Sequence, residues 1–244
     1  MCLEDFLGIR CCVCLKSKNN MKNFLKKIIN NKSILKFLFR FFTYVHNKAY
    51  VALSTIAILQ NNGVHPKHRI LNYHQFFVEH IDATDTILDI GCAHGNNAYD
   101  VAGKAKEVVG IDIEQKYIDV AKKKFQRQNV TYIVGDATTY QFGKKFDKVI
   151  LSNVLEHIEH RIEFLKKLHP LTNTILFRVP LISRDWLPVY KKEQGVESRL
   201  DLTHFTEYTV EQAKEELAQS GWKFAEYSIN FGEIWGVLVP IDTL

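Results

Sequence analysis

The sequence has no uncharged hydrophobic run long enough to form a transmembrane helix. It also has no internal repeat and no low-complexity tract, which argues against a repeat architecture. Its basic N-terminal stretch lacks a clean apolar segment and a small-residue cleavage site, so we expect no signal peptide. The hydrophobic fraction of 46% over 244 residues is enough for one sizeable core, and predicts one domain with an N-terminal extension.

Cysteine is scarce and unevenly placed: four of the five lie within the first 14 residues, and the fifth is Cys92. An odd, clustered set is no disulfide framework and is typical of a reducing compartment, so we expect a cytoplasmic protein. Cys11 and Cys14 have the spacing of half a metal site. No second pair follows them in the sequence, and we therefore expect no metal ion.

The positive charge is confined to one end of the chain. Residues 1–50 contain ten Lys or Arg and two Asp or Glu, a net charge of +8, whereas the remaining residues carry a net charge of −3. A mildly acidic body argues against a nucleic-acid-binding face. The sequence also has no Asn-Pro-Pro-Tyr segment, so nucleic acid is not an expected partner.

The N-terminal region divides into two parts. Residues 1–20 are expected to be a disordered or artefactual lead, with Met21 as the natural first residue. Residues 21–65 form a basic extension, in which 22–45 are helix-like and one stripe collects the cations Lys22, Lys26, Lys32, Lys36 and Arg40. A wide apolar face beside a cationic stripe is typical of a helix at a membrane surface. Packing on the main domain or on a second subunit is the equal alternative, and a second apolar run, 49–59, is expected to pack on the domain.

From about residue 66 to the end, strand-like and helix-like segments alternate, which predicts an α/β domain with a mostly parallel sheet. Strands are expected at 86–90, 107–111, 130–134, 146–151 and 174–179, with helices at 96–105, 115–127, 156–168 and 210–220. Two further strands, 223–230 and 234–240, follow each other closely and predict a terminal antiparallel hairpin.

A glycine-containing loop follows the first of these strands. The dinucleotide pattern Gly-x-Gly-x-x-Gly would need glycines at 91, 93 and 96, and only Gly91 fits. The pattern acidic-x-Gly-x-Gly-x-Gly is matched at Asp89, Gly91 and Gly95, with Ala93 as a small substitute. The loop therefore resembles that of class I S-adenosylmethionine-dependent methyltransferases.

Three further strand ends extend this resemblance. Asp112 lies 21 residues after Gly91, where a carboxylate can accept hydrogen bonds from both ribose hydroxyls. Asp136 resembles the residue that accepts from the adenine amino group, with Ala137 behind it. The segment Ser152-Asn-Val-Leu-Glu-His157 resembles the part of small-molecule methyltransferases that closes over the methionine end of the cofactor.

The resemblance covers residues 68–240 and implies a Rossmann-like class I fold with a seven-stranded sheet, helices on both faces and an N-terminal helical extension. It implies direct in-line transfer of a methyl group from S-adenosylmethionine, which leaves S-adenosylhomocysteine. His157 is the first choice as general base and His204 the second, because imidazole titrates near neutral pH. The expected cofactor-binding residues are Tyr73, Asp89, Gly91, Cys92, Ala93, Gly95, Asp112, Ile113, Asp136, Ala137, Ser152 and Asn153.

The acceptor is less defined by the sequence. Segment 181–205 follows the fifth strand and is long enough to be a substrate lid. We expect a small-molecule, glycan or lipid-linked acceptor, and the basic extension favours one at a membrane surface. Two alternatives stay open, an NAD-type Rossmann oxidoreductase and a non-catalytic scaffold that binds S-adenosylmethionine.

Overall fold

The structure is a computed structural model that describes residue 26 and residues 30–199 and 201–241. The chain divides into two compact units, 1–66 and 67–244, and each is described by itself. The predicted lead, 1–20, and the predicted start at Met21 lie outside the described residues.

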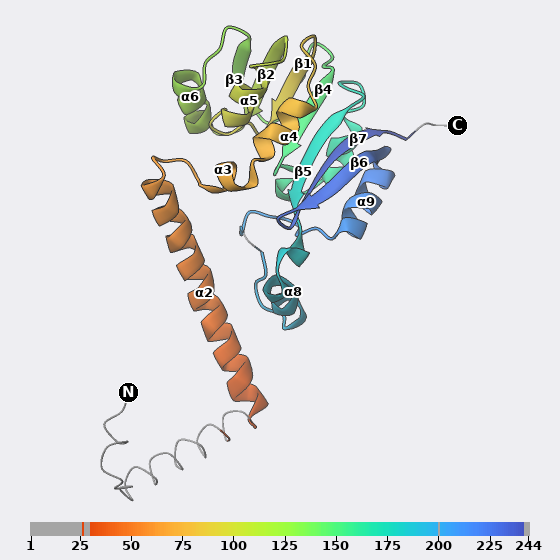
Figure 1. The fold of residues 1–244 in the computed structure, drawn as a ribbon. Coiled ribbons are helices and arrows are strands. Elements are labelled where there is room, and N and C mark those ends of the chain that lie inside the picture. Colours follow the sequence, from red (N-terminus) through yellow and green to blue (C-terminus); the bar gives the residue numbers. More distant parts are fainter. Residues whose placement is uncertain (1–25, 27–29, 200, 242–244) are drawn as a thin grey trace, which may run out of the picture. The chain divides into compact units, whose positions relative to one another are not determined.

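One long helix, α2 (Lys32–Gln60), dominates the first unit (Figure 1). Asn31 caps it, because its side chain accepts hydrogen bonds from the backbone N–H groups of Ser33 and Ile34. The sequence predicted a helix over 22–45 and a separate apolar run at 49–59, and this division is wrong: one helix contains residues 32–60. In the described part of the chain, no helix combines the length and the apolar character needed to cross a bilayer.

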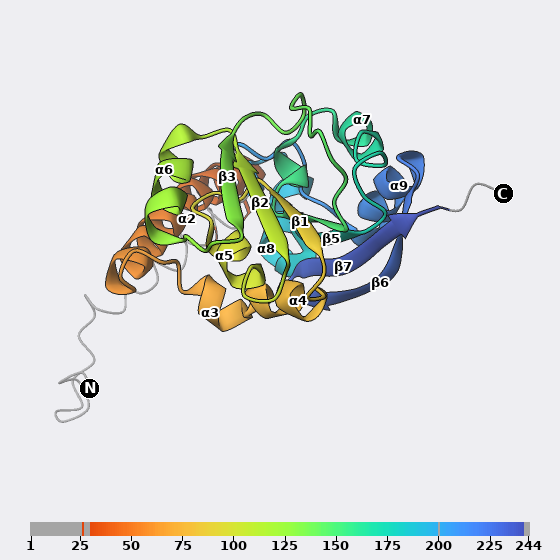
Figure 2. The same ribbon diagram turned by 90° about the horizontal axis from the view of Figure 1, so that it is seen from above.

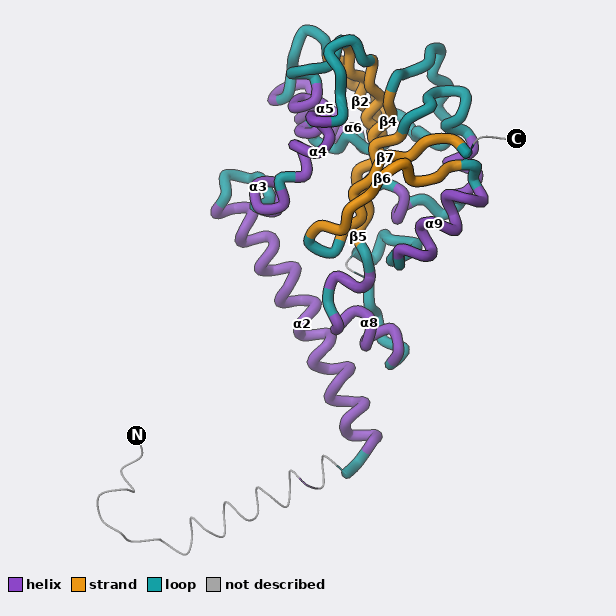
Figure 3. The backbone as a smooth tube through the Cα atoms, turned by 45° about the vertical axis from the view of Figure 1, so that its right-hand side comes forward, coloured by secondary structure: helices purple, strands orange, loops and turns teal. Residues whose placement is uncertain are grey.

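The second unit is built on one sheet with strands β1 (Thr86–Ile90), β2 (Glu107–Asp112), β3 (Val130–Val134), β4 (Lys148–Ser152), β5 (Ile175–Pro180), β6 (Trp222–Asn230) and β7 (Glu233–Pro240). Their order in the sheet is β3-β2-β1-β4-β5-β7-β6. The first five strands are parallel, and β7 runs antiparallel between β5 and β6. Figure 3 shows them as one twisted sheet. The predicted fold class, including the terminal hairpin, is confirmed.

Helices cover both faces of this sheet (Figure 2). One face packs against α4 (Tyr73–Glu79), α5 (Asn96–Val101) and α6 (Gln115–Lys124). The other packs against α7 (Arg161–Lys166) and α9 (Val210–Gln219). Strand residues alternate between the two cores, as Ile150 and Leu151 do, because successive side chains of a strand point to opposite faces.

Several helices differ from the predicted ones. Helices α5 and α6 end earlier than expected, and α3 (Lys67–Leu71), α4 and α8 (Trp186–Glu193) were not predicted from the sequence. The largest error concerns 156–168, which was expected to be a single helix. A 3-10 turn, η2 (Leu155–His157), comes first and α7 begins only at Arg161. Glu156 is therefore not in the first turn of the long helix.

The parallel strands place their carboxyl ends along one edge of the sheet. The register pairs Asp89 of β1 with Gly110 of β2 and with Ile150 of β4, so these three strands end close together. In an open α/β sheet, ligands bind outside this edge. The acidic strand-end residues of the sequence therefore belong to one region.

Candidate active site

The loop between β1 and α5 takes three left-handed residues within five positions. Gly91 has φ +67°, Ala93 +46° and Gly95 +85°. The backbone N–H groups of Gly91 and Cys92 donate to the carbonyl of Ile111, at 2.8 and 3.1 Å. Cys92 itself is buried, which raises the pKa of its thiol. The side chain of Cys92 thus packs in the core and is not exposed at the surface of the loop.

Asp89 is the most perturbed acid of this region. Its side chain is 1% exposed, and its Oδ2 atom has no hydrogen-bond partner among the described residues. Burial, assisted by the negative charge of Asp112, raises the pKa of Asp89 to about 8. A cation would stabilise the charged form of a carboxyl group that is buried in this way. A cationic ligand at the strand ends would supply that positive charge.

Asp112, at the end of β2, joins the loop to the next strand. Its Oδ2 accepts from the backbone N–H of Ala93 and its Oδ1 from that of Glu114, both at 2.9 Å. Each carboxylate oxygen has two lone pairs, so the group can still accept from a ligand. Next to it, the side chain of Ile113 is 66% exposed and gives this end of β2 an apolar surface.

Asp136 follows β3 in a tight turn. Its Oδ1 accepts from the backbone N–H of Thr138 at 2.9 Å and from the hydroxyl of the same residue at 2.7 Å. Asp136 is exposed, and Ala137 behind it packs partly against the core. The turn thus engages one carboxylate oxygen of Asp136, Oδ1, in hydrogen bonds.

Ser152 and Tyr73 meet at a residue that the sequence did not indicate, Arg178 of β5. The guanidinium of Arg178 donates to Ser152 Oγ at 3.2 Å and lies 3.6 Å from the centre of the Tyr73 ring. It also pairs through two hydrogen bonds of 2.7 Å with Glu233 of β7. Burial raises the pKa of Tyr73 to about 12. Tyr73, on α4, is thus fixed over the end of β5.

Asn153, the first residue after β4, has a left-handed backbone with φ +56°. Its N–H donates to the carbonyl of Arg178 at 2.8 Å, whereas its side-chain Oδ1 is buried without a partner in the described part of the chain. Asn153 is the point where the chain leaves β4 and turns into η2. Its orientation places the following residues beyond the end of the sheet.

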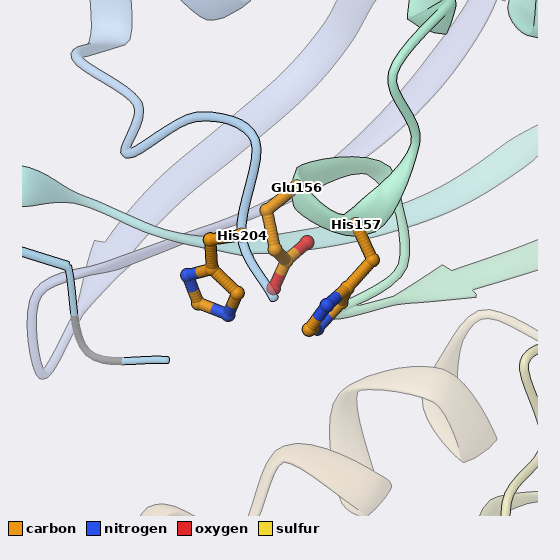
Figure 4. A group of neighbouring side chains, drawn as sticks. All are labelled: Glu156, His157 and His204. Atoms are coloured by element: carbon orange, nitrogen blue, oxygen red, sulfur yellow. The ribbon is translucent and has the colours of Figure 1, made fainter. Parts of the chain in front are cut away.

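Glu156, His157 and His204 form a cluster beyond β4, and Figure 4 shows their side chains converging. Ligand atoms of all three lie within 4.8 Å of one another. The rings of His157 and His204 pack edge to face with centroids 4.6 Å apart. Burial raises the pKa of Glu156 to about 7, while desolvation and the neighbouring His204 lower the pKa of His157. The two histidines that the sequence singled out as candidate bases are therefore neighbours.

Sequence reasoning missed Glu156, Arg178 and Glu207 as members of this region. Glu156 is the first residue of the helix expected over 156–168, where an acidic side chain is ordinarily favourable, yet it is fully buried. Glu207 accepts from His204 Nδ1 at 3.0 Å and also pairs with Arg184. Glu156 could have been found in the sequence from its place between Leu155 and His157, shortly after a buried strand. Arg178 within the apolar run of β5 was a comparable signal.

Comparison with known proteins adds to this geometry. Residues 87–174 match the family model described as a methyltransferase domain. Within these residues the chain carries a methyltransferase domain. The family, the fold and the cofactor predicted from the sequence are thereby confirmed.

Among curated relatives, a probable (S)-tetrahydroprotoberberine N-methyltransferase of Papaver bracteatum is 31% identical over 102 residues, which are 39% of this chain and 28% of that protein. The chain thus spans less than a third of that relative. Magnesium protoporphyrin IX methyltransferase of Synechocystis, solved with bound S-adenosylhomocysteine, has a TM-score of 0.54 at 17% identity, covering 90% and 99% of the two chains. A TehB-like S-adenosylmethionine-dependent methyltransferase of Corynebacterium glutamicum has a TM-score of 0.55 at 14% identity, covering 80% and 98%. These two structures share the fold.

The residues of this methyltransferase domain fit its cofactor chemically. S-adenosylmethionine carries a sulfonium and an ammonium group, and the strand ends offer a buried, unpartnered carboxylate oxygen on Asp89. Two buried amide oxygens, on Asn97 and Asn153, also have no partner among the described residues and can accept from a ligand. Asp112 supplies lone pairs for hydroxyl groups. The site combines negative charge with acceptors, as a cationic nucleoside requires.

Proposed function

We propose that this protein is an enzyme that transfers the methyl group of S-adenosylmethionine to a small-molecule acceptor. The observation that carries the proposal is the pair of carboxylates at the glycine loop, Asp89 with its unpartnered oxygen and Asp112 at the end of the neighbouring strand. The cofactor supplies a methyl group on a sulfonium, which a nucleophile can displace directly. The residues of the chain bind, orient and exclude water.

In this proposal the predicted cofactor residues divide by chemistry. Asp89 faces the positive charge of the methionine end, Asp112 accepts from the ribose hydroxyls, and Asp136 with its neighbour Ala137 faces the adenine. Ile113 covers the base with its exposed side chain. The backbone of the loop 91–95 admits the methionine end, and Tyr73, Ser152 and Asn153 close that end from the side of β4 and β5.

Binding of the cofactor is tested by calorimetric titration of the full chain with S-adenosylhomocysteine. Asp112→Ala removes the carboxylate that holds Ala93 of the loop and is proposed to accept from the ribose hydroxyls, and we expect affinity to fall at least about tenfold, or about 1.4 kcal/mol. Asp119→Ala is the matched control, because Asp119 is an exposed acid on α6. Saturable binding of NAD with no binding of S-adenosylhomocysteine would favour the oxidoreductase alternative instead.

The acceptor side of the proposal rests on segment 181–205 and on the relatives. Helix α8 within this segment exposes Trp186 and Tyr190, which suits a planar or apolar acceptor. Relatives are named for alkaloid and porphyrin substrates, and we propose an acceptor of comparable size, with glycan or lipid-linked molecules as further candidates. Trp186→Ala should raise the acceptor KM and leave cofactor affinity unchanged. Loss of affinity for S-adenosylhomocysteine in this variant would contradict a lid that serves the acceptor alone.

His157 and His204 are proposed to handle the acceptor's nucleophilic atom. They lie beyond β4, on the side where the methionine end of the cofactor would project. A panel of amines, phenols and alcohols with methyl-labelled cofactor measures the activity. Cofactor binding without transfer to any class of acceptor would favour the scaffold alternative.

A membrane-surface contact through residues 22–45 is a separate proposal. Helix α2 exposes the aromatic residues Phe37, Phe41 and Phe42 together with its lysines. We expect the full chain to co-sediment with anionic vesicles, and Lys32→Glu, Lys36→Glu and Arg40→Glu together to abolish this. The same reversal at the exposed Lys122, Lys123 and Lys124 of α6 is the control with equal charge change. Equal partitioning of both triple variants would refute the contact.

A further inference from the structure

We propose that Glu156, His157 and His204 bind a divalent transition-metal ion. Their ligand atoms all lie within 4.8 Å of one another, although Glu156 and His157 follow β4 and His204 comes from segment 181–205 (Figure 4). One carboxylate and two imidazoles are a common ligand set for such an ion.

Glu156 is 0% exposed, and neither of its carboxylate oxygens has a hydrogen-bond partner among the described residues. Burying an ionised carboxylate without a partner is strongly unfavourable, so buried carboxylates are paired or bind metals. The nearby guanidinium of Arg178 is already engaged by both oxygens of Glu233. The backbone holds Glu156 in place, because its carbonyl accepts from the N–H of Phe205 at 2.8 Å. This carboxylate lacks a counter-charge that a cation would supply.

His204 is oriented by a second carboxylate, that of Glu207. Its Nδ1 lies 3.0 Å from Glu207 Oε1, and Glu207 Oε2 is bound by Arg184. A carboxylate paired with a guanidinium can only accept, so Nδ1 carries the proton. The lone pair of His204 is therefore on Nε2. A carboxylate behind the histidine is the usual arrangement around a metal-binding imidazole.

His157 is oriented in the same way by Thr203. The Thr203 hydroxyl donates to Asp201 Oδ1 at 2.8 Å, and its oxygen lies 2.9 Å from His157 Nδ1. With its only proton committed to Asp201, the hydroxyl accepts from His157, and Nδ1 again carries the proton. Both histidines thus keep an unprotonated Nε2. Two separate sets of outer residues favour the same tautomer, which leaves Nε2 of each ring able to bind a metal ion.

The ligand set also indicates the kind of ion and its use. Imidazole ligands favour Zn²⁺, Co²⁺ or Fe²⁺ over Mg²⁺ and Ca²⁺, and three protein ligands leave at least one position open. If the proposed methyl transfer is correct, on which this role alone rests, an acceptor hydroxyl can take that position. The metal would then lower the pKa of the hydroxyl, and the oxygen would attack the methyl after losing its proton to solvent. His157 and His204 would act as ligands in place of bases.

The experiment is a titration of chelator-treated, tag-free full chain with Co²⁺, followed by its visible absorption and by competition with Zn²⁺. Cys11→Ser and Cys14→Ser are introduced throughout, because these thiols could bind the same ions. We expect one ion per chain, with absorption typical of nitrogen and oxygen ligands. Glu156→Gln, His157→Ala and His204→Ala should each weaken binding by more than about 100-fold. Glu207→Gln should weaken it about 10–100-fold, as outer residues do.

His160→Ala is the matched control, because His160 is exposed and lies only three residues from His157. Binding of S-adenosylhomocysteine by Glu156→Gln should stay unchanged, which shows that the variant is folded and separates this proposal from the cofactor site. Absence of Co²⁺ binding at micromolar concentration would overturn the proposal. Binding that survives all three ligand substitutions, or that falls equally in His160→Ala, would overturn it as well.

Discussion

The guanidinium of Arg178 stacks on the ring of Tyr73 at 3.6 Å while it pairs with Glu233 through two hydrogen bonds. Arg178 is 2% exposed, so the pair with Glu233 is shielded from water. This arrangement links α4, β5 and β7 beside the proposed methionine end of the cofactor. The stability of this corner, where α4, β5 and β7 meet, depends on the pairing of the buried Arg178 with Glu233.

Removing one partner of this pair should be costly. Glu233→Ala leaves the Arg178 charge buried, and we expect the free energy of unfolding to fall by about 3–5 kcal/mol. Arg178→Met combined with Glu233→Leu should recover much of that loss, because neither charge is then left unpaired. Urea denaturation of the three proteins measures this. A double variant as unstable as Glu233→Ala would show that the stability of this corner depends on the shape of the packed side chains and not on their charge.

Asp89 should make the stability of the folded protein depend on pH. The folded-state pKa of about 8 lies above the ordinary value of 3.8, so the folded protein holds a proton that the unfolded chain has lost. The stability that protonated Asp89 contributes to the folded protein is fully present below pH 3.8 and is lost as the pH rises towards about 8. Asp89→Asn should therefore become more stable relative to the unmodified protein as pH rises through this window. Thermal unfolding at a series of pH values measures the difference, and parallel curves for the two proteins would contradict it.

Glu216 should make the free energy of unfolding depend on pH in the acidic range. Burial favours its neutral form, but hydrogen bonds from Arg161 and Tyr208 outweigh burial and hold the pKa of Glu216 below its usual range. A depressed pKa gives stability that is present above 4.5 and is lost as pH falls through the folded-state value. Glu216→Gln should therefore be less stable than the unmodified protein at neutral pH, and the gap should narrow in acid. A gap that stays constant with pH, measured by urea denaturation, would exclude this electrostatic origin.

The glycine loop should respond in opposite ways to two small substitutions. Ala93 has φ +46°, so Ala93→Gly should relieve strain and leave stability equal or higher by up to about 1 kcal/mol. Gly95 has φ +85°, and a Cβ there would lie 2.6 Å from the Tyr132 hydroxyl and 2.9 Å from the Cβ of Ala121. Gly95→Ala should lower the unfolding temperature and weaken binding of S-adenosylhomocysteine. Differential scanning fluorimetry with and without that ligand tests both substitutions, and a Gly95→Ala protein of unchanged stability would argue against the close packing.

Much of the fold could be predicted because its signals are local. The buried strands appear as short apolar runs, and Asp89, Asp112 and Asp136 stand at or directly after the ends of three of them. Parallel strands bring such ends to one edge whatever the details of packing. Helix ends were predicted less well: in 156–168 the apolar spacing continued through a 3-10 turn that the local sequence does not distinguish from a helix.

The sequence by itself determined the order of the strands along the chain, the glycine loop and the acids that follow each strand, because these depend on neighbours in the chain. Only the tertiary structure decided which charges are buried and what they meet. Arg178 pairs with a residue 55 positions away, and His204 reaches His157 across 47 positions. Burial and pairing depend on the whole packed sheet and on the path of segment 181–205. That is why the sequence placed Glu156 only at the start of an expected helix, whereas in the folded protein it is a buried carboxylate next to two oriented histidines.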